Sequence, residues 1–387
     1  MKLKNNIRLF NFFSFFSSLD FYIPIKIVYF YQVTGSYATA ASIISFVWIA
    51  QALLEVPTGI LSDFLGRKKT ILIGALCSVI AYALYAGGDS YWIFILGSFL
   101  EGARRALFSG NNNAYLHNLL SNEEKENDFH HYYGKLNSVM GVAMFLAALA
   151  SGFLAAWSIN LFMWINVIPQ IAALLIATLL MDIKHEEKAN TNIYSHVKEA
   201  LIEIKGNLNL RYLSLSQILG GGGLAAYEYQ AAVYAAVWPT WAIGVARAVQ
   251  EAGVVPSFWF AGKIIDKLGI VKVLAISWIT ATLGNIIAAL TRSFISPIFI
   301  MLSLPLYGAG DTAQQKLMQN EFTERQRATI ASLNSLGNSI SFSIVLYICG
   351  LIANQYGPFM ALLATQVFLI PSNYYQFKLL ARIRKTR

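Results

Sequence analysis

Charged side chains interrupt several long apolar runs of this sequence, and their types and spacing suit proton or substrate binding. The first half of the chain holds Asp20, Lys26, Glu101, Arg104 and Arg105. Asp20 falls near the middle of its apolar run, at a depth where Arg104 or Arg105 can pair with it. Lys26 lies about 9 Å further along the same helix at 1.5 Å per residue, and Glu101 is at roughly matching depth. A network of Asp20, Lys26, Glu101 and Arg105 is therefore geometrically possible.

The second half of the chain carries a similar set of polar residues in apolar surroundings. Arg247 and Glu251 are i, i+4 neighbours on one helix, and Glu101 and Arg105 share that spacing, so each pair is either a structural ion pair or part of a site. Asp20 has no partner one turn away, so it is a leading candidate for proton or substrate contact, together with Glu228. The candidates in this half are Tyr227, Glu228, Tyr229, Arg247, Glu251, Asp311 and Gln314.

The composition indicates that these charges lie inside a membrane. Apolar residues make up 56% of the chain and charged residues only 13%, whereas soluble domains carry roughly 25% charged residues. A charge at the bilayer centre costs from about 3 to more than 10 kcal/mol, so each one is a functional candidate. The net charge of +9 comes from short clusters between apolar runs, which argues against nucleic-acid binding and for loop charges that fix the topology.

Twelve apolar runs are long enough to be spanning helices, which need about 20 residues each. Alternating period-2 patterns that would favour a β-barrel do not compete with them. The sequence therefore predicts an all-α integral membrane protein. The expected spans are 9–32, 38–61, 71–88, 91–117, 134–157, 160–181, 211–236, 239–262, 271–291, 295–319, 328–353 and 358–380.

The basic residues predict the orientation and the domain organisation. If the N-terminus is cytoplasmic, nearly all lysines and arginines of the loops fall on the inside, as the positive-inside rule requires. The longest polar stretch, 182–209, separates an N-terminal six-helix bundle, 1–181, from a C-terminal one, 210–387. Within this linker, 193–204 has helical periodicity and is expected to lie on the cytoplasmic surface.

The two halves contain an internal repeat. The spacing of Gly59, Asp63 and Gly66 returns 203 residues later as Gly262, Asp266 and Gly269, each time between the second and third helix of its half. LeuAsnSerVal at 136–139 returns as LeuAsnSerLeu at 333–336, at the start of each fifth helix. Several matches in order at offsets near 200 indicate duplication, which in transporters places a midplane site between two helical bundles.

The loop motif also carries a family resemblance. Gly59-x-x-x-Asp63-x-x-Gly66-Arg67-Lys68 resembles the loop signature of the Major Facilitator Superfamily, and the preceding residues 55–58 resemble a variant of bacterial branches. The resemblance implies two pseudo-symmetric six-helix bundles in a bacterial inner membrane. It also implies that Asp63 contacts the N-terminus of helix eleven near Arg327 and that this contact breaks during transport. Phe64 departs from the pattern, because many members carry a basic residue there.

These features predict a secondary active transporter rather than an enzyme, with a small-molecule substrate, protons and the lipid bilayer as its partners. No ATP-binding glycine loop or hydrolytic motif is found, so we expect no cofactor, and we expect a monomer. Resemblance to bacterial drug exporters favours proton-coupled efflux of an amphipathic molecule. The alternative is proton-coupled uptake of an anionic metabolite or siderophore that Arg104, Arg105 or Arg247 clamps. A non-transporting receptor or scaffold is the remote alternative.

Overall fold

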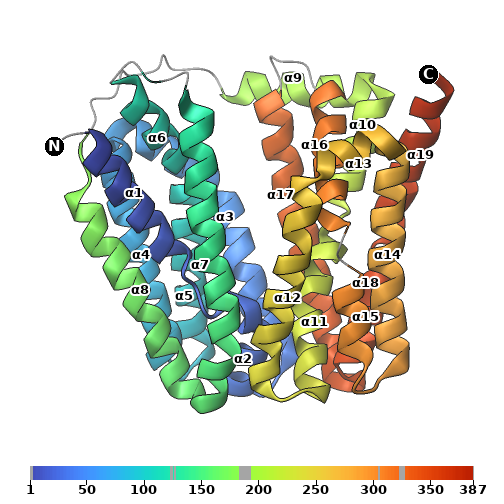
Figure 1. The fold of residues 1–387 in the computed structure, drawn as a ribbon, viewed down its shortest axis with the longest axis horizontal. Coiled ribbons are helices and arrows are strands. Elements are labelled where there is room, and N and C mark those ends of the chain that lie inside the picture. Colours follow the sequence, from blue (N-terminus) through green and yellow to red (C-terminus); the bar gives the residue numbers. More distant parts are fainter. Residues whose placement is uncertain are drawn as a thin grey trace. The chain divides into compact units, whose positions relative to one another are not determined.

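The N-terminal half of the chain is a bundle of helices (Figure 1). The computed structural model describes residues 3–122, 125, 128–182, 193–303, 306–321 and 327–386. The elements of this half are α1 (Leu3–Ser18), η1 (Ile23–Ile25), α2 (Lys26–Thr34), α3 (Tyr37–Leu65), α4 (Arg67–Gly87), α5 (Tyr91–Phe108), α6 (Asn111–Ser121), α7 (Phe129–Trp157) and α8 (Ile159–Leu179).

The C-terminal half follows the same plan. Its first helix, α9, covers the segment whose periodicity predicted a helix in the linker. The elements are α9 (Ile193–Gly206), α10 (Leu208–Ile218), α11 (Gly221–Val237), α12 (Thr240–Trp259), α13 (Ala261–Leu268), α14 (Ile270–Thr291), α15 (Ser296–Leu302), α16 (Tyr307–Glu321), α17 (Arg327–Tyr356), α18 (Pro358–Phe368) and α19 (Ile370–Thr386).

Half of the predicted spans are single long helices and the other half are interrupted. Within the described residues, six helices are long and apolar enough to cross a membrane, and they lie in α3, α4, α7, α8, α14 and α17. The other six spans, expected as single helices, are instead pairs of shorter ones. These pairs are α1 with α2, α5 with α6, α10 with α11, α12 with α13, α15 with α16, and α18 with α19.

The interruptions occur where the sequence weakens a helix. In the first span, helix α1 stops before Asp20, and Pro24 follows within η1, where its missing N–H cannot continue a helical ladder. Gly110 separates α5 from α6 with a φ of 69°, and a glycine run begins at Gly220 between α10 and α11. Hydropathy averaged over a whole run did not predict these breaks, because the apolar residues of the run outweigh the few polar ones at the break, such as Asp20 and Asn111.

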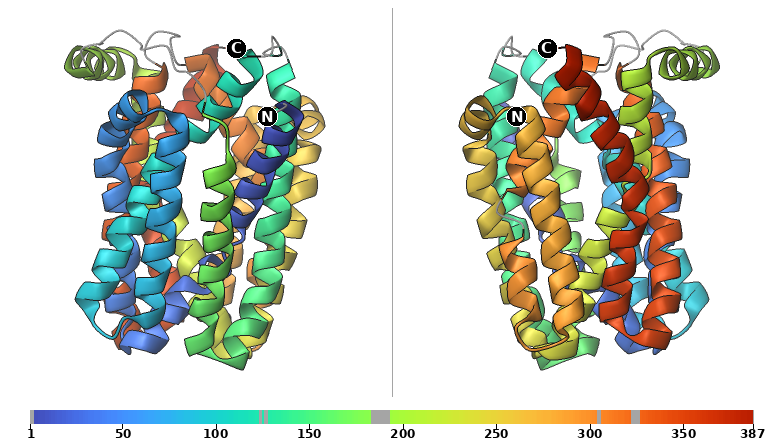
Figure 2. Two further views of the ribbon diagram at one scale, coloured as in Figure 1. Left: turned by 90° about the vertical axis from the view of Figure 1, so that its left-hand side faces the viewer. Right: turned by 90° about the vertical axis from the view of Figure 1, so that its right-hand side faces the viewer.

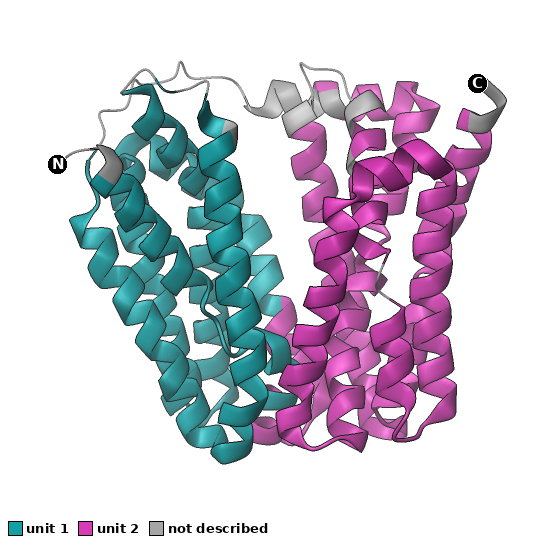
Figure 3. Ribbon diagram, viewed as in Figure 1, with its two compact units in different colours: residues 1–29, 46–189 teal, residues 30–45, 190–387 magenta. Residues whose placement is uncertain are grey.

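The chain divides into two compact units, residues 1–29 with 46–189, and residues 30–45 with 190–387 (Figure 3). Helix α3 begins in the second unit and ends in the first. Its beginning is tied to α17: the Tyr37 N–H donates to Asn354 Oδ1 at 2.7 Å, and Ser45 and Ser343 each donate to the other's main-chain oxygen. The linker predicted at 182–209 lies partly outside the described residues, so the domain boundaries stay a prediction.

Each unit has its own apolar core. In the first unit, α4 and α8 lie side by side and pack against each other and against α5 and α1 (Figure 2). Phe10, Phe13 and Tyr115 are fully buried in this core. In the second unit, α14 packs against α16 and α18, with Leu210 and Ile330 in a comparable cluster. Large apolar side chains such as Trp92 and Leu175 are exposed on the outside of the first unit, as expected of surfaces that face lipid.

The repeat read from the sequence is present in the backbone. Gly66 (φ 89°, ψ 155°) and Gly269 (φ 79°, ψ 152°) adopt nearly the same conformation, and each is the residue before the third span of its half. A side chain is strained at a positive φ, so glycine is required for the turn at both positions. The two copies of the loop are therefore equivalent in structure as well as in sequence.

Candidate functional site

The break in the first span places Asp20 in the interior of the first unit. Residues 19–22 lie between α1 and η1, and Asp20 is 3% exposed. A break in a helix frees main-chain groups that need partners inside a protein. The freed N–H of Phe21 donates to Asn166 Oδ1 on α8 at 2.7 Å. Helix α8 thus holds the break in place, and the break presents the Asp20 carboxylate to α4 and α5.

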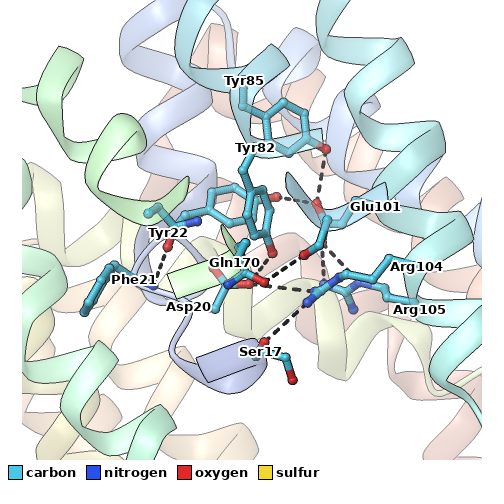
Figure 4. Close-up of polar contacts among 12 residues, drawn as sticks. Ser17, Asp20, Phe21, Tyr22, Tyr82, Tyr85, Glu101, Arg104, Arg105 and Gln170 are labelled. Atoms are coloured by element: carbon cyan, nitrogen blue, oxygen red, sulfur yellow. Dashed lines mark hydrogen bonds and ion pairs between the residues drawn. The ribbon is translucent and has the colours of Figure 1, made fainter. Parts of the chain in front are cut away.

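Asp20 has few partners for a buried carboxylate (Figure 4). Its Oδ2 atom accepts a hydrogen bond from the hydroxyl of Tyr82 on α4. The same atom lies 3.8 Å from the guanidinium of Arg104 on α5, which is a long ion pair. Its Oδ1 atom is buried and receives no hydrogen bond from any described residue. The charge of Asp20 is therefore only partly compensated.

Glu101 on α5 has the opposite environment. Its Oε1 atom accepts hydrogen bonds from Arg105 Nη2 at 2.7 Å and Nε at 3.1 Å, and its Oε2 atom accepts from Tyr22 at 3.0 Å and Tyr85 at 3.1 Å. The Tyr85 hydroxyl also lies within hydrogen-bonding distance of Ser98 Oγ, at 3.1 Å. A carboxylate that accepts several charge-assisted and hydroxyl hydrogen bonds is held firmly in its ionised form.

The cations of this cluster are held by aromatic rings as well as by carboxylates. The Arg104 guanidinium lies 5.6 Å from the Tyr82 ring centre, and that of Arg105 lies 5.4 Å from the Trp48 ring centre. Both distances are in the range of cation–π attraction. Lys26 is also buried and is close enough to act electrostatically on Glu101.

The structure brings together all five polar residues that the sequence selected in this half. It pairs Asp20 with Arg104, and Glu101 with Arg105. Their role in proton or substrate binding stays a prediction. Sequence reasoning missed the aromatic and amide residues that complete the cluster: Tyr22, Trp48, Tyr82, Tyr85, Asn166 and Gln170. The available signal was the presence of three tyrosines, a tryptophan and two amides on apolar spans that were otherwise interpreted as core.

In the second unit, Arg247 on α12 is the centre of a separate network. Arg247 is 1% exposed, and its Nη1 atom donates to Gln230 and Gln250 at 3.2 Å. Its Nη2 atom donates to the main-chain oxygen of Tyr227, whose ring centre lies 3.6 Å from the guanidinium carbon. Gln230 also donates to Asn285 on α14 at 3.0 Å. The network joins α11, α12 and α14 around one buried cation.

The other candidates of this half lie on α11, α12 and α16. Glu228 is 5% exposed, and Glu251 is half-buried, one turn after Arg247, which acts on it electrostatically. Asp311 on α16 is half-buried, and Gln314 accepts a hydrogen bond from Gln376. Tyr229 is fully buried and donates to the main-chain oxygen of Leu346 at 2.8 Å, so its contact holds α11 against α17. The sequence did not single out Gln230, Gln250 or Asn285.

The loop between α3 and α4 forms a small polar cluster of its own. Asp63 and Arg67 form an ion pair at 2.8 Å, and Arg67 also donates to Ser62, which donates to Asn111 at 2.6 Å. Asp266 in the second copy is exposed, and Ile270 stands where Arg67 would recur, so this ion pair belongs to the first copy alone.

The remaining residues of the expected gate are less constrained. Gly59 and Gly262 have no described atom within 4 Å of the place where a Cβ would lie. Lys68 is half-buried at the start of α4. The side chain of Arg327 lies outside the described residues, so the expected contact between Asp63 and the start of α17 stays a prediction.

The fold and the buried charge clusters define this chain as a polytopic α-helical membrane protein of the transporter class. Residues 9–370 match the Major Facilitator Superfamily, so the chain belongs to this family. Its fold is accordingly that of two pseudo-symmetric bundles with six spans each. The interrupted spans above are the way in which this chain builds half of those twelve spans.

Individual relatives are distant in sequence but cover almost the full chain. Multidrug resistance protein 2 of Bacillus subtilis (strain 168) is 23% identical over 352 residues, which cover 86% of this chain and 84% of that protein. A variant of the nucleoside transporter NupG matches with a TM-score of 0.82 at 15% identity, over 98% of this chain and 99% of the other. A bacterial homologue of the human lysosomal transporter Spinster matches with a TM-score of 0.77 at 15% identity, over 100% and 98%. These two structures support the fold alone.

Proposed function

We propose that this protein is a proton-coupled secondary transporter of a bacterial inner membrane, with both termini in the cytoplasm. It exports a small amphipathic organic molecule by alternating access, and Asp20 carries the coupling proton in the N-terminal half. Glu228 is the corresponding candidate in the C-terminal half, because it is a buried carboxylate flanked by tyrosines on an interrupted span.

The contrast between Asp20 and Glu101 is the observation that supports this proposal. Coupling requires a group that changes its charge during the cycle. Glu101 is fixed by four hydrogen bonds from Arg105, Tyr22 and Tyr85, so protonating it would weaken these bonds and leave Arg105 without its counter-charge. Asp20 has one hydrogen bond, a long ion pair and an unpaired oxygen. Of the two carboxylates, Asp20 therefore exchanges a proton at the smaller energetic cost.

One coupled proton supplies enough free energy for useful accumulation of a substrate. Moving one elementary charge through 100 mV contributes about 2.3 kcal/mol, which supports a concentration gradient of roughly fiftyfold. An exporter that exchanges one proton for one neutral substrate molecule needs no further energy source. The stoichiometry proposed is therefore at least one proton per substrate.

Export is supported over uptake by two features. The relative with the broadest sequence match reported above is named a multidrug resistance protein. In addition, the three arginines that an anion clamp would use are already engaged: Arg104 with Asp20, Arg105 with Glu101, and Arg247 with Gln230 and Gln250. Binding an anionic substrate would have to displace these partners, whereas an amphipathic molecule can use the aromatic side chains beside them.

Transport into everted membrane vesicles tests this proposal. Vesicles that contain the full-length protein are energised, and uptake of fluorescent amphipathic dyes is followed as a function of pH. We expect Asp20→Asn to abolish the dependence on the proton gradient and Glu228→Gln to weaken it. Asp89→Asn is the matched control, because Asp89 lies exposed between α4 and α5. Unchanged proton dependence in both Asp20→Asn and Glu228→Gln would exclude these carriers, and uptake only in right-side-out vesicles would exclude export.

A further inference from the structure

A group of buried polar atoms lies at the break in the first span. These atoms come from the break itself, from α5 and from α8. Asp20 Oδ1, Arg104 Nε, Asn166 Nδ2 and Gln170 Nε2 are all closed to solvent, and none has a hydrogen-bond partner among the described residues. Leaving such a group unsatisfied costs about 1–3 kcal/mol, more for a charged one. Native proteins contain few of them, and ordered water is a common explanation where several occur together.

The hydrogen bond of Asn166 fixes which of its ends is unpaired. The Phe21 N–H can only donate, so it must meet the oxygen of Asn166, and the Asn166 NH₂ group is therefore the end without a partner. Gln170 follows one turn later on the same face of α8, and its Oε1 atom accepts from Ser78 on α4 at 2.8 Å. Both side chains are fully buried. Helix α8 thus carries both amides toward the break, and Figure 4 shows the Gln170 side chain beside Asp20.

The chemistry of these atoms selects a small neutral ligand. A bound anion would be repelled by the carboxylate of Asp20, and a bound cation would face Arg104 and the two amide NH₂ groups. Water both donates and accepts, and a buried water is typically held by two to four polar partners. The atoms present, one carboxylate oxygen and at least two N–H donors, match that requirement.

We propose that Asn166 and Gln170 hold ordered water against Oδ1 of Asp20, and that this water hydrates the carboxylate and relays its proton. The inference rests on the proposed role of Asp20 as a proton carrier. The carboxylate is then stabilised on Oδ2 by Tyr82 and on Oδ1 by water. From α5, Arg104 and Arg105 further balance its charge, and the carboxylate of Glu101 opposes it. Asn166 and Gln170 are positioning residues, since they act on Asp20 through the water.

The carboxylate of this site has no counterpart at the corresponding position of the second half. The halves are related by offsets near 200 residues, and an offset of 200 matches Gln366 on α18 with Asn166 on α8; Gln366 is also buried. The same offset places Gly220 at the position of Asp20. A buried amide is therefore present at this position in each half, but glycine stands in the second half where the first has the Asp20 carboxylate. Gln366 provides a matched control for the two amides.

Infrared difference spectroscopy on the full-length protein in lipid membranes tests the inference with water itself as the probe. The carboxyl C=O band of Asp20 is assigned by its loss in Asp20→Asn. Exchange of H₂¹⁶O for H₂¹⁸O identifies O–H bands of ordered water that change with pH. We expect Asn166→Leu with Gln170→Leu to remove these water bands and to move the Asp20 C=O band to higher frequency, because a carboxyl without hydrogen bonds has the higher frequency. Gln366→Leu should leave both bands unchanged.

The outcomes separate this inference from the proposed function. If an Asp20 band is present and the double variant changes neither it nor the water bands, the inference is wrong while Asp20 remains the proton carrier. If Asp20→Asn removes no carboxyl band and transport stays proton-dependent, the proposed function fails first. The single variant Gln170→Met, close to glutamine in size and shape, gives the same comparison should the double variant fail to fold. We expect it to shift the pH midpoint of transport by about half a unit or more.

Discussion

Tyr82 on α4 donates a hydrogen bond to Asp20 in the break of the first span, across 62 residues of sequence. The ring of the same tyrosine lies against the guanidinium of Arg104, which pairs with the same carboxylate. One side chain thus contacts the proposed proton carrier and its cationic partner at once. A substitution of Tyr82 should therefore change the proton dependence of transport.

Replacing Tyr82 with phenylalanine keeps the ring and removes only the hydroxyl donor. A hydrogen bond to a charged group contributes about 1.5–3 kcal/mol, so we expect the pH midpoint of transport to rise by about one to two units. The direction follows because the ionised form of Asp20 loses a donor, and the proton is then released only at higher pH. Tyr85→Phe is the control, because Tyr85 donates to Glu101. Equal shifts in the two variants would contradict the assignment.

The Glu101–Arg105 pair should contribute to stability in a way that depends on both partners. Breaking a buried pair by removing one member leaves an uncompensated charge and costs about 3–5 kcal/mol. We expect Glu101→Gln and Arg105→Met each to lower the free energy of unfolding in detergent by this amount, and the double variant to lose clearly less than the sum. The exposed pair of Asp63 and Arg67 is the comparison, at about 0–1 kcal/mol. Additive losses at Glu101 and Arg105 would show that the two side chains act independently.

Gly66→Ala and Gly269→Ala should have similar effects, because the two glycines have nearly the same positive φ in the two copies of the loop. A side chain in this region of backbone space costs about 1–3 kcal/mol. Thermal unfolding of the two variants measures this cost. Gly59→Ala should be tolerated, since Gly59 is within a helix without a positive φ and without close described neighbours. A large loss in only one of Gly66→Ala and Gly269→Ala would mean that the two turns are not equivalent.

Arg247→Lys tests the network of the second unit while conserving the charge. A lysine cannot donate to Gln230 and Gln250 from a planar fork or stack flat on Tyr227, as the guanidinium does. A desolvated cation–π contact contributes about 2 kcal/mol or more, so we expect transport to fall by about tenfold or more at unchanged expression. The exposed Arg292→Lys variant serves as a control for the exchange itself. Full activity of Arg247→Lys would show that charge alone suffices at this position.

Much of the architecture follows from the sequence because it depends on local properties. Hydropathy located the spans, since a helix of about 20 apolar residues is what a bilayer accepts. The spacing of Gly59, Asp63 and Gly66 and its repetition indicated both the family and the duplication. Rise per residue placed Asp20 at the depth of Arg104 and Arg105, and Lys26 at roughly that of Glu101. These predictions need only the distance along each helix.

Only the tertiary structure determines which side chains of neighbouring helices are in contact, because this depends on the rotation of each helix about its axis. Depth gave Asp20 two possible partners, and only the rotation and packing of α5 assign it to Arg104 and leave Arg105 to Glu101. The tyrosines and amides that complete the cluster come from α4 and α8, at sequence separations that no periodicity connects. The break at Asp20 is itself a tertiary effect, because Asn166 accepts the main-chain N–H that the break frees. An interrupted helix is stable in the membrane only where a neighbour satisfies its backbone.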